Sequence, residues 1–212
     1  MNNKNKLFGV AIMGSGLFAI LTLLIVTKNN FIYGIDNDIA AIVRFHPTSQ
    51  LDQVMQVISW LSSPMMIGLY SVILMIILYK LRSSVLAIWT GMTIMTGALL
   101  IKLIKSSVQR PRPMGHGSIS GFSFPSGHTF GVTLFCLTIT SIMLVEFKYS
   151  KQFLINCLLV IWIIMIMISR VYLQAHFPTD TIGAVLLAVI WIAIARVVYL
   201  KISNKLKLRA KK

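Results

Sequence analysis

The sequence contains few acidic residues, few cysteines and few charges of any kind. Of its 212 residues, 5 are Asp or Glu and 2 are Cys, and charged residues make up 12%. Cys136 and Cys157 lie in apolar segments and have no spacing typical of a disulfide framework or a metal site. The chain also lacks repeats, low-complexity linkers and domain boundaries. These absences favour one domain over residues 1–212.

Apolar segments dominate what is present, with 57% hydrophobic residues and a mean hydropathy of +0.82. Several runs approach the ~20 residues that a helix needs to cross ~30 Å of hydrocarbon. Because loops and open sheet edges cannot satisfy their backbone groups in lipid, we expect helical spans. The prediction is an all-α integral membrane protein, a bundle of six transmembrane helices at about residues 7–27, 56–79, 83–103, 127–146, 151–170 and 178–200.

The first two apolar runs each leave a question. Lys4 and Lys6 precede the first run, as in a secretory signal, but its length and the lack of a small-residue cleavage site before Lys28 favour a retained anchor. The second run, 53–79, is longer than one span requires and contains Pro64. It is either one long span or a span whose first part rests at the membrane interface.

Basic residues orient this bundle, because cytoplasmic loops retain Lys and Arg. With six spans and a cytoplasmic amino terminus, 13 of the 20 Lys and Arg lie inside and 7 outside. We therefore predict a plasma-membrane protein with both termini cytoplasmic. The basic tail, 201–212, is interpreted as a topology signal that faces anionic head groups. A formal charge of +15 suggests nucleic acid in a soluble protein, but here it faces lipid phosphate, so no nucleic-acid partner is predicted.

Polar residues that could perform chemistry gather on the outer side of this predicted topology. Four of the seven outer cations crowd into 102–112, and Arg170 lies at the outer end of the fifth span. The segments before the fourth span and before the sixth span emerge on the same face. We therefore predict an active site at the outer face of the bundle, formed by Lys105, Arg112, Ser126, Gly127, His128, Arg170, His176 and Asp180.

The residue types in this cluster indicate a site for a multiply charged anion. Asp180 is the one carboxylate that we expect near its cations, and Arg supplies forked donors suited to phosphate oxygens. Ser126 resembles an N-cap, and Gly127 allows close backbone approach, so a helix start would aim free N–H groups at the anion. Asp180, four residues after His176, can orient the imidazole and leave its other nitrogen free to attack.

Three motifs together resemble the type 2 phosphatidic acid phosphatase (PAP2) superfamily of lipid phosphate phosphatases. Each motif is complete, and all three follow the expected order: Lys105-x6-Arg112-Pro113, Pro125-Ser126-Gly127-His128 and Ser169-Arg170-x5-His176-x3-Asp180. The resemblance implies that His176 is the nucleophile, Asp180 orients it and His128 protonates the leaving group. It further implies that the phosphate is held by Lys105, Arg112, Ser126, Gly127 and Arg170. It implies no metal and no other cofactor.

The substrate implied by this resemblance is a lipid phosphate or pyrophosphate in the membrane. Phosphatidylglycerophosphate, undecaprenyl pyrophosphate and phosphatidic acid all remain candidates, because the motifs recognise only phosphate. An anion transporter or channel with a basic outer vestibule is the main alternative, although the charges stop at one face. A vanadate-dependent haloperoxidase shares the motifs but is soluble. The sequence does not indicate the oligomeric state.

Several polar residues lie outside the motifs. We interpret Arg110 either as a solvated rim residue or as a substrate contact. His46 and His116 are expected in exposed loops, and Asp36 and Asp38 are expected to be solvated or to cap a helix.

Overall fold

The structure is a computed structural model that describes residues 3–81, 84–113, 121–146 and 152–209. His116 lies outside these residues. Every regular element in the described ranges is an α-helix, which confirms the predicted all-α class. The helices are α1 Asn3–Val26, α2 Asn30–Val43, α3 Ser49–Leu61, α4 Pro64–Lys80, α5 Ser84–Val108, α6 Gly127–Glu146, α7 Gln152–Tyr172 and α8 Pro178–Arg209.

Capping side chains divide the segment after α1 into short helices. The Asn29 side chain accepts a hydrogen bond from the Phe31 amide at 3.0 Å and so begins α2. Thr48 caps α3 in the same way, and Ser63 caps α4 with Pro64 at its first turn. The predicted second span, 56–79, therefore contains a helix break, because α3 ends at Leu61 and α4 begins at Pro64.

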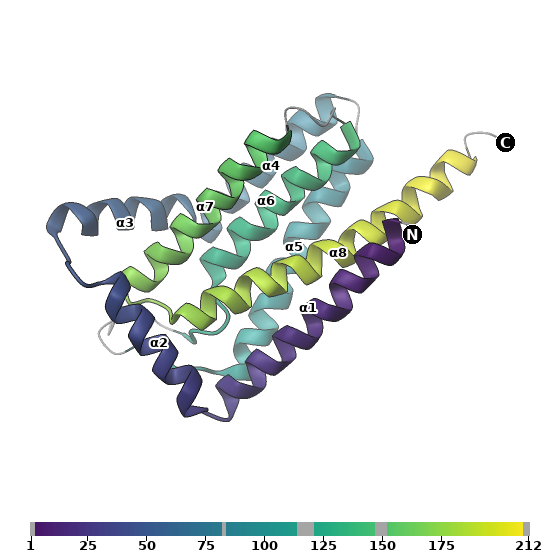
Figure 1. The fold of residues 1–212 in the computed structure, drawn as a ribbon. Coiled ribbons are helices and arrows are strands. Elements are labelled where there is room, and N and C mark those ends of the chain that lie inside the picture. Colours follow the sequence, from purple (N-terminus) through teal and green to yellow (C-terminus); the bar gives the residue numbers. More distant parts are fainter. Residues whose placement is uncertain (1–2, 82–83, 114–120, 147–151, 210–212) are drawn as a thin grey trace.

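In the described ranges, five helices are each long and apolar enough to cross a membrane, namely α1, α5, α6, α7 and α8. Helices α3 and α4 pass the same test only as a pair, with a bend of 47° between them, and would make a sixth span. The long helices lie side by side, and α1 packs along α8 (Figure 1). The amino terminus lies at one end of the bundle, whereas α2 and the start of α8 lie at the other (Figure 1).

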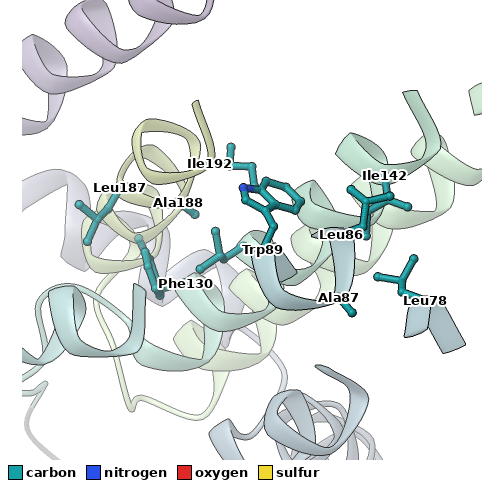
Figure 2. Close-up of a cluster of buried hydrophobic side chains, with 11 residues drawn as sticks. Leu78, Leu86, Ala87, Trp89, Phe130, Ile142, Leu187, Ala188 and Ile192 are labelled. Carbon is teal, nitrogen blue, oxygen red and sulfur yellow. The ribbon is translucent and has the colours of Figure 1, made fainter. Parts of the chain in front are cut away.

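The main core joins α5, α6 and α8 around Trp89 (Figure 2). Its indole Nε1 donates a 2.8 Å hydrogen bond to the Ala195 carbonyl, so the polar atom of this side chain is satisfied inside the core. Gly97 permits the close approach of these helices, since a Cβ there would lie 2.6 Å from Leu134. Lipid offers no hydrophobic drive for helices to associate, and small residues at such contacts allow the packing that holds the bundle together.

Candidate active site

The structure brings the predicted site residues to one end of the bundle, although five separate segments supply them. Lys105 lies in the last turn of α5, and Arg170 lies in the last turn of α7. His176 precedes α8, and Asp180 lies in its first turn, as predicted from Pro178. The remaining predicted residues are Arg112, which follows α5, and Ser126, Gly127 and His128 at the start of α6.

A tight turn between α7 and α8 places His176. Gln174 has a left-handed backbone with φ of 53°, and the amides of Ala175 and His176 both donate to the Arg170 carbonyl, at 3.1 and 3.2 Å. The His176 side chain is 2% exposed. Its position is thus determined by the backbone of the last turn of α7.

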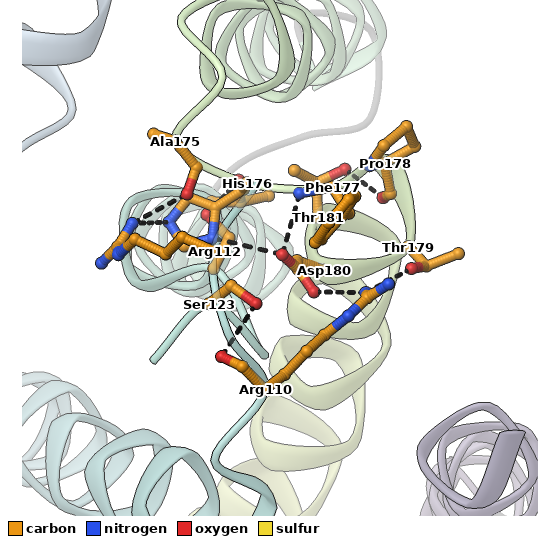
Figure 3. Close-up of polar contacts among 12 residues, drawn as sticks. Arg110, Arg112, Ser123, Ala175, His176, Phe177, Pro178, Thr179, Asp180 and Thr181 are labelled. Atoms are coloured by element: carbon orange, nitrogen blue, oxygen red, sulfur yellow. Dashed lines mark hydrogen bonds and ion pairs between the residues drawn. The ribbon is translucent and has the colours of Figure 1, made fainter. Parts of the chain in front are cut away.

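The two nitrogens of the His176 ring face groups of opposite charge. Nδ1 lies 3.5 Å from Asp180 Oδ2, and Nε2 lies 3.5 Å from Arg112 Nη1 (Figure 3). The Nδ1 contact is long for a hydrogen bond, and this buried nitrogen has no hydrogen-bond partner among the residues that the structure describes. Burial lowers the pKa of His176 to about 4, although Asp180 raises it, so the imidazole is neutral at pH 7.

Asp180 is completely buried, and both of its carboxylate oxygens accept hydrogen bonds. Arg110 Nη1 donates to Oδ1 at 2.7 Å, and the Phe177 amide donates to Oδ2 at 2.9 Å. The Asp180 carbonyl accepts from the Ser126 amide at 3.1 Å, which ties the start of α6 to the start of α8. These contacts bring two of the three sequence motifs into direct contact.

Arg110 and Asp36 form a buried ion pair that we did not predict. The side chain of Arg110 is 1% exposed, and its Nη2 lies 2.6 Å from Oδ2 of the fully buried Asp36 of α2. The solvated interpretations of both residues are therefore wrong, as is the expectation that Asp180 is the one carboxylate near the cations. Asp38 and His46 are exposed, as predicted. Burial alone would lower the pKa of Arg110, but Asp180 and Asp36 outweigh it and raise that pKa.

Arg112 connects the segment after α5 to the turn between α7 and α8. Its Nη1 donates to the Ala175 carbonyl at 2.8 Å, and its Nε donates to the Gly121 carbonyl at 3.1 Å. Burial lowers the pKa of this guanidinium, which nevertheless stays charged at neutral pH because its ordinary pKa is far higher. A cavity of about 730 Å³ opens beside Arg112 and His176 and is also lined by Asn37 of α2 and by Arg44, which follows α2.

The cations in the spans also converge on this end. Lys105 interacts electrostatically with Arg112, Arg170 and Asp180. His128 is half-buried and interacts electrostatically with Arg170 and His176. Like charges held this close repel one another, so an anion between them would be strongly favoured.

Arg170 is 5% exposed, and its side chain is held by α3, a helix that we did not predict to be part of the site. Its Nη1 donates to the Ser59 hydroxyl of α3, while its Nε is buried and has no hydrogen-bond partner within the described part of the chain. The neighbouring Ser169 hydroxyl donates to the Met55 carbonyl at 2.7 Å. Helix α3 therefore holds the end of α7, and Arg170 retains an unsatisfied donor.

The start of α6 lies next to an apolar cavity. Ser126 is fully buried, its carbonyl accepts from the Phe130 amide at 3.0 Å, and its hydroxyl accepts from Thr129 Oγ1 at 3.1 Å. Gly127 lines a cavity of about 350 Å³ whose other walls are side chains of α4, α5 and α6, among them Ile67, Ile101 and Phe130. An ionic site and a hydrocarbon-lined cavity thus adjoin at Gly127.

The fold and site together define a helical membrane protein with a histidine, a carboxylate and several cations at one end of its bundle. The profile of the PAP2 superfamily matches residues 86–203. The chain belongs to this superfamily.

Two relatives are each named phosphatidylglycerophosphatase B. The Haemophilus influenzae protein is 39% identical over 70 residues, which cover 32% of this chain and 29% of that protein. The Bacillus subtilis protein is 30% identical over 103 residues, which cover 45% of this chain and 51% of that protein. The matched segments thus span about a third and about half of these relatives.

Two solved structures share the fold. A transmembrane PAP2 type phosphatidylglycerolphosphate phosphatase from Bacillus subtilis matches with a TM-score of 0.82 and 23% identity, over 91% of this chain and 96% of that one. Aquifex aeolicus LpxE matches with a TM-score of 0.55 and 20% identity, over 77% of this chain and 93% of that one. The first match extends the likeness in fold to nearly the whole helical bundle. The five long apolar helices found among the described residues, together with membership of the superfamily, indicate a multi-pass membrane protein.

Proposed function

We propose that this chain is a membrane lipid phosphatase that removes phosphate from lipid phosphomonoesters or pyrophosphates through a phosphohistidine on His176. One observation carries the proposal: the buried imidazole has a carboxylate beside Nδ1 and a guanidinium beside Nε2, each at 3.5 Å. A nucleophile paired with an orienting carboxylate, next to a cation that can hold the target, is the arrangement that covalent catalysis requires.

The first chemical step is attack by Nε2 of His176 on phosphorus. The bond from phosphorus to the lipid oxygen breaks, and His128 donates a proton to that oxygen as it leaves. Asp180 stabilises the positive charge that develops on the imidazole. The Ser126 hydroxyl and the Gly127 amide bind the phosphoryl oxygens. Three cations bind them as well, namely Lys105, Arg112 and Arg170.

The second step is attack by water on the phosphohistidine. His128 accepts the proton from this water, the bond from phosphorus to Nε2 breaks, and inorganic phosphate leaves. Catalysis here is mainly positioning and electrostatic stabilisation of the phosphoryl group, which the three cations and the start of α6 provide. No metal or other cofactor is needed in this mechanism.

Three features support a lipid as the substrate. The site belongs to a membrane bundle, the cavity beside Gly127 is lined by apolar side chains, and two relatives are named phosphatidylglycerophosphatase B. Phosphatidylglycerophosphate is therefore the first substrate to test, followed by undecaprenyl pyrophosphate and phosphatidic acid. Membership of a phosphatase superfamily disfavours the anion-transporter alternative.

We further propose that residues 1–212 form a single domain in the bacterial plasma membrane, with both termini cytoplasmic and the site extracytoplasmic. The support is the basic-residue asymmetry together with the position of the amino terminus and of the site at opposite ends of the bundle (Figure 1). An extracytoplasmic site favours lipids of the outer leaflet.

Phosphate release from purified protein tests the proposed function. The substrates are the three lipids and the soluble monoester p-nitrophenyl phosphate, and the matched control is His176→Ala. We expect at least one lipid to have a higher kcat/KM than the soluble ester, and turnover to fall by roughly 10³-fold or more in the control. Absence of phosphate release from all three lipids, or equal release by the control, would contradict the proposal.

A further inference from the structure

The Asp36 carboxylate of α2 is buried inside the catalytic end of the bundle. Its Oδ2 accepts from Arg110 Nη2 at 2.6 Å and from Thr179 Oγ1 at 2.7 Å, and its Oδ1 accepts from the Thr179 amide at 2.9 Å. Burying an ion pair is weak support for stability, because desolvation offsets the attraction between the charges. A fully buried carboxylate at this place therefore calls for a role besides stability.

Arg110 connects Asp36 to Asp180 through separate nitrogens of one guanidinium. Nη2 donates to Asp36, whereas Nη1 donates to Asp180 Oδ1 at 2.7 Å and to Thr179 Oγ1 at 2.8 Å. The rings of Tyr33 and Phe177 hold the guanidinium as well, with centroids 4.8 and 4.2 Å from its central carbon. Groups from α2 and α8 thus determine where Arg110 lies.

Because Arg110 binds Asp180 through Nη1 and Asp36 through Nη2, one oxygen of Asp180 stays turned toward His176 (Figure 3). Oδ1 accepts from Arg110, while Oδ2 accepts from the Phe177 amide and faces His176 Nδ1 at 3.5 Å. An arginine fork ordinarily binds both oxygens of one carboxylate. Asp36→Asn would leave one acceptor oxygen in place of two, so position 36 could no longer accept from both Arg110 Nη2 and the Thr179 amide. An Nη2 without its acceptor would compete for Oδ2 and turn the Asp180 carboxylate away from His176.

The charges of the cluster point the same way. One guanidinium lies between two carboxylates, so Arg110, Asp36 and Asp180 together carry −1. This surplus negative charge lies beside His176 and favours the positive imidazole that forms as its other nitrogen bonds to phosphorus.

We propose that Asp36 is a positioning residue, which holds Arg110 so that Asp180 keeps one carboxylate oxygen directed at His176. This role rests on the proposed function, because it concerns the attack by His176 on phosphorus. It makes α2, which lies outside the residues matched by the family profile, part of the catalytic arrangement.

Steady-state kinetics of Asp36→Asn test this role, with Asp38→Asn as the matched control. Asp38 lies on the same helix and carries the same charge but is exposed. We expect kcat of Asp36→Asn to fall about 10- to 100-fold, the range for lost catalytic alignment, with KM changed less than about twofold because Asp36 does not contact the phosphate. Asp38→Asn should behave as the unmodified protein.

A double-mutant cycle separates positioning from a structural role. If Asp36 acts through Asp180, adding Asp36→Asn to Asp180→Asn should change kcat by less than about twofold. The same 10- to 100-fold loss in both backgrounds would overturn the proposal, as would an unchanged kcat in Asp36→Asn. Thermal unfolding in detergent gives the folded fraction to which each rate is normalised.

Thr179→Val keeps the proposal testable if Asp36→Asn does not fold. It removes the hydroxyl that links Arg110 to Asp36 but leaves no buried charge unpaired. We expect kcat to fall about 2- to 10-fold, again only when Asp180 is present. An unchanged kcat would overturn the positioning role, whereas an unmodified protein that releases no lipid phosphate would overturn the proposed function and this role with it.

Discussion

The Asp180 carboxylate faces the imidazole of His176, with Oδ2 3.5 Å from Nδ1. Both side chains are almost completely buried from solvent. Both residues were assigned from a spacing of four along the chain, and a carboxylate in this place stabilises the charged form of the ring. The balance between that carboxylate and burial decides the protonation state of the nucleophile.

His176 should stay neutral well below the pH at which an exposed histidine is protonated. Burial lowers its pKa to about 4, so protonation, and with it loss of the nucleophile, should occur only as the pH falls through about 4. NMR titration of histidine ring carbons, with the His176 signal assigned from His176→Ala, should show no shift between pH 5.5 and 8. A titration near pH 6.5 for this signal would contradict the expectation.

Loss of His128 should matter most for substrates with poor leaving groups. His128→Ala is expected to slow hydrolysis of a lipid phosphomonoester by roughly 10²- to 10⁴-fold, the usual contribution of a general acid. The loss should be smaller for p-nitrophenyl phosphate, whose leaving group needs little protonation. Equal losses in kcat/KM for the two substrates would show that His128 is not the proton donor.

The reaction should proceed without a divalent metal. Within the described ranges, no three His, Cys, Asp or Glu side chains are grouped so that they could hold a metal ion. Activity is expected to survive EDTA, and vanadate is expected to inhibit by mimicking five-coordinate phosphorus. A strict requirement for Mg²⁺, restored only by adding the metal, would show that the mechanism is wrong.

Sidedness follows from the charge pattern and can be measured by cysteine labelling. In a background with Cys136 and Cys157 replaced by Ala, His46→Cys should react with an impermeant thiol reagent in spheroplasts. Lys80 is exposed and is the last residue of α4, and Lys80→Cys should react only after the membrane is opened. The opposite labelling pattern would reverse the topology and with it the preference for outer-leaflet lipids.

The elements that depend on local chemistry could be predicted from the sequence. The lengths of the apolar segments indicated the long helices. Pro178 located the start of α8, and the Ser126-Gly127 pair located the start of α6. The buried contacts of Asp36 could not be predicted, because its partner Arg110 lies 74 residues away and an acidic residue in a short helix ordinarily remains in water. The bond from Arg170 to Ser59 spans 111 residues and was missed for the same reason.

Trapping the phosphorylated enzyme tests the central claim most directly. Protein mixed with a ³²P-labelled lipid phosphate and quenched within one turnover should carry acid-labile, base-stable phosphate, and peptide mass spectrometry should assign it to His176. His176→Ala should carry none, while Asp180→Asn should form it more slowly, because the imidazole remains but its developing charge is not stabilised. Phosphate trapped on any other residue, or full labelling of His176→Ala, would contradict the account.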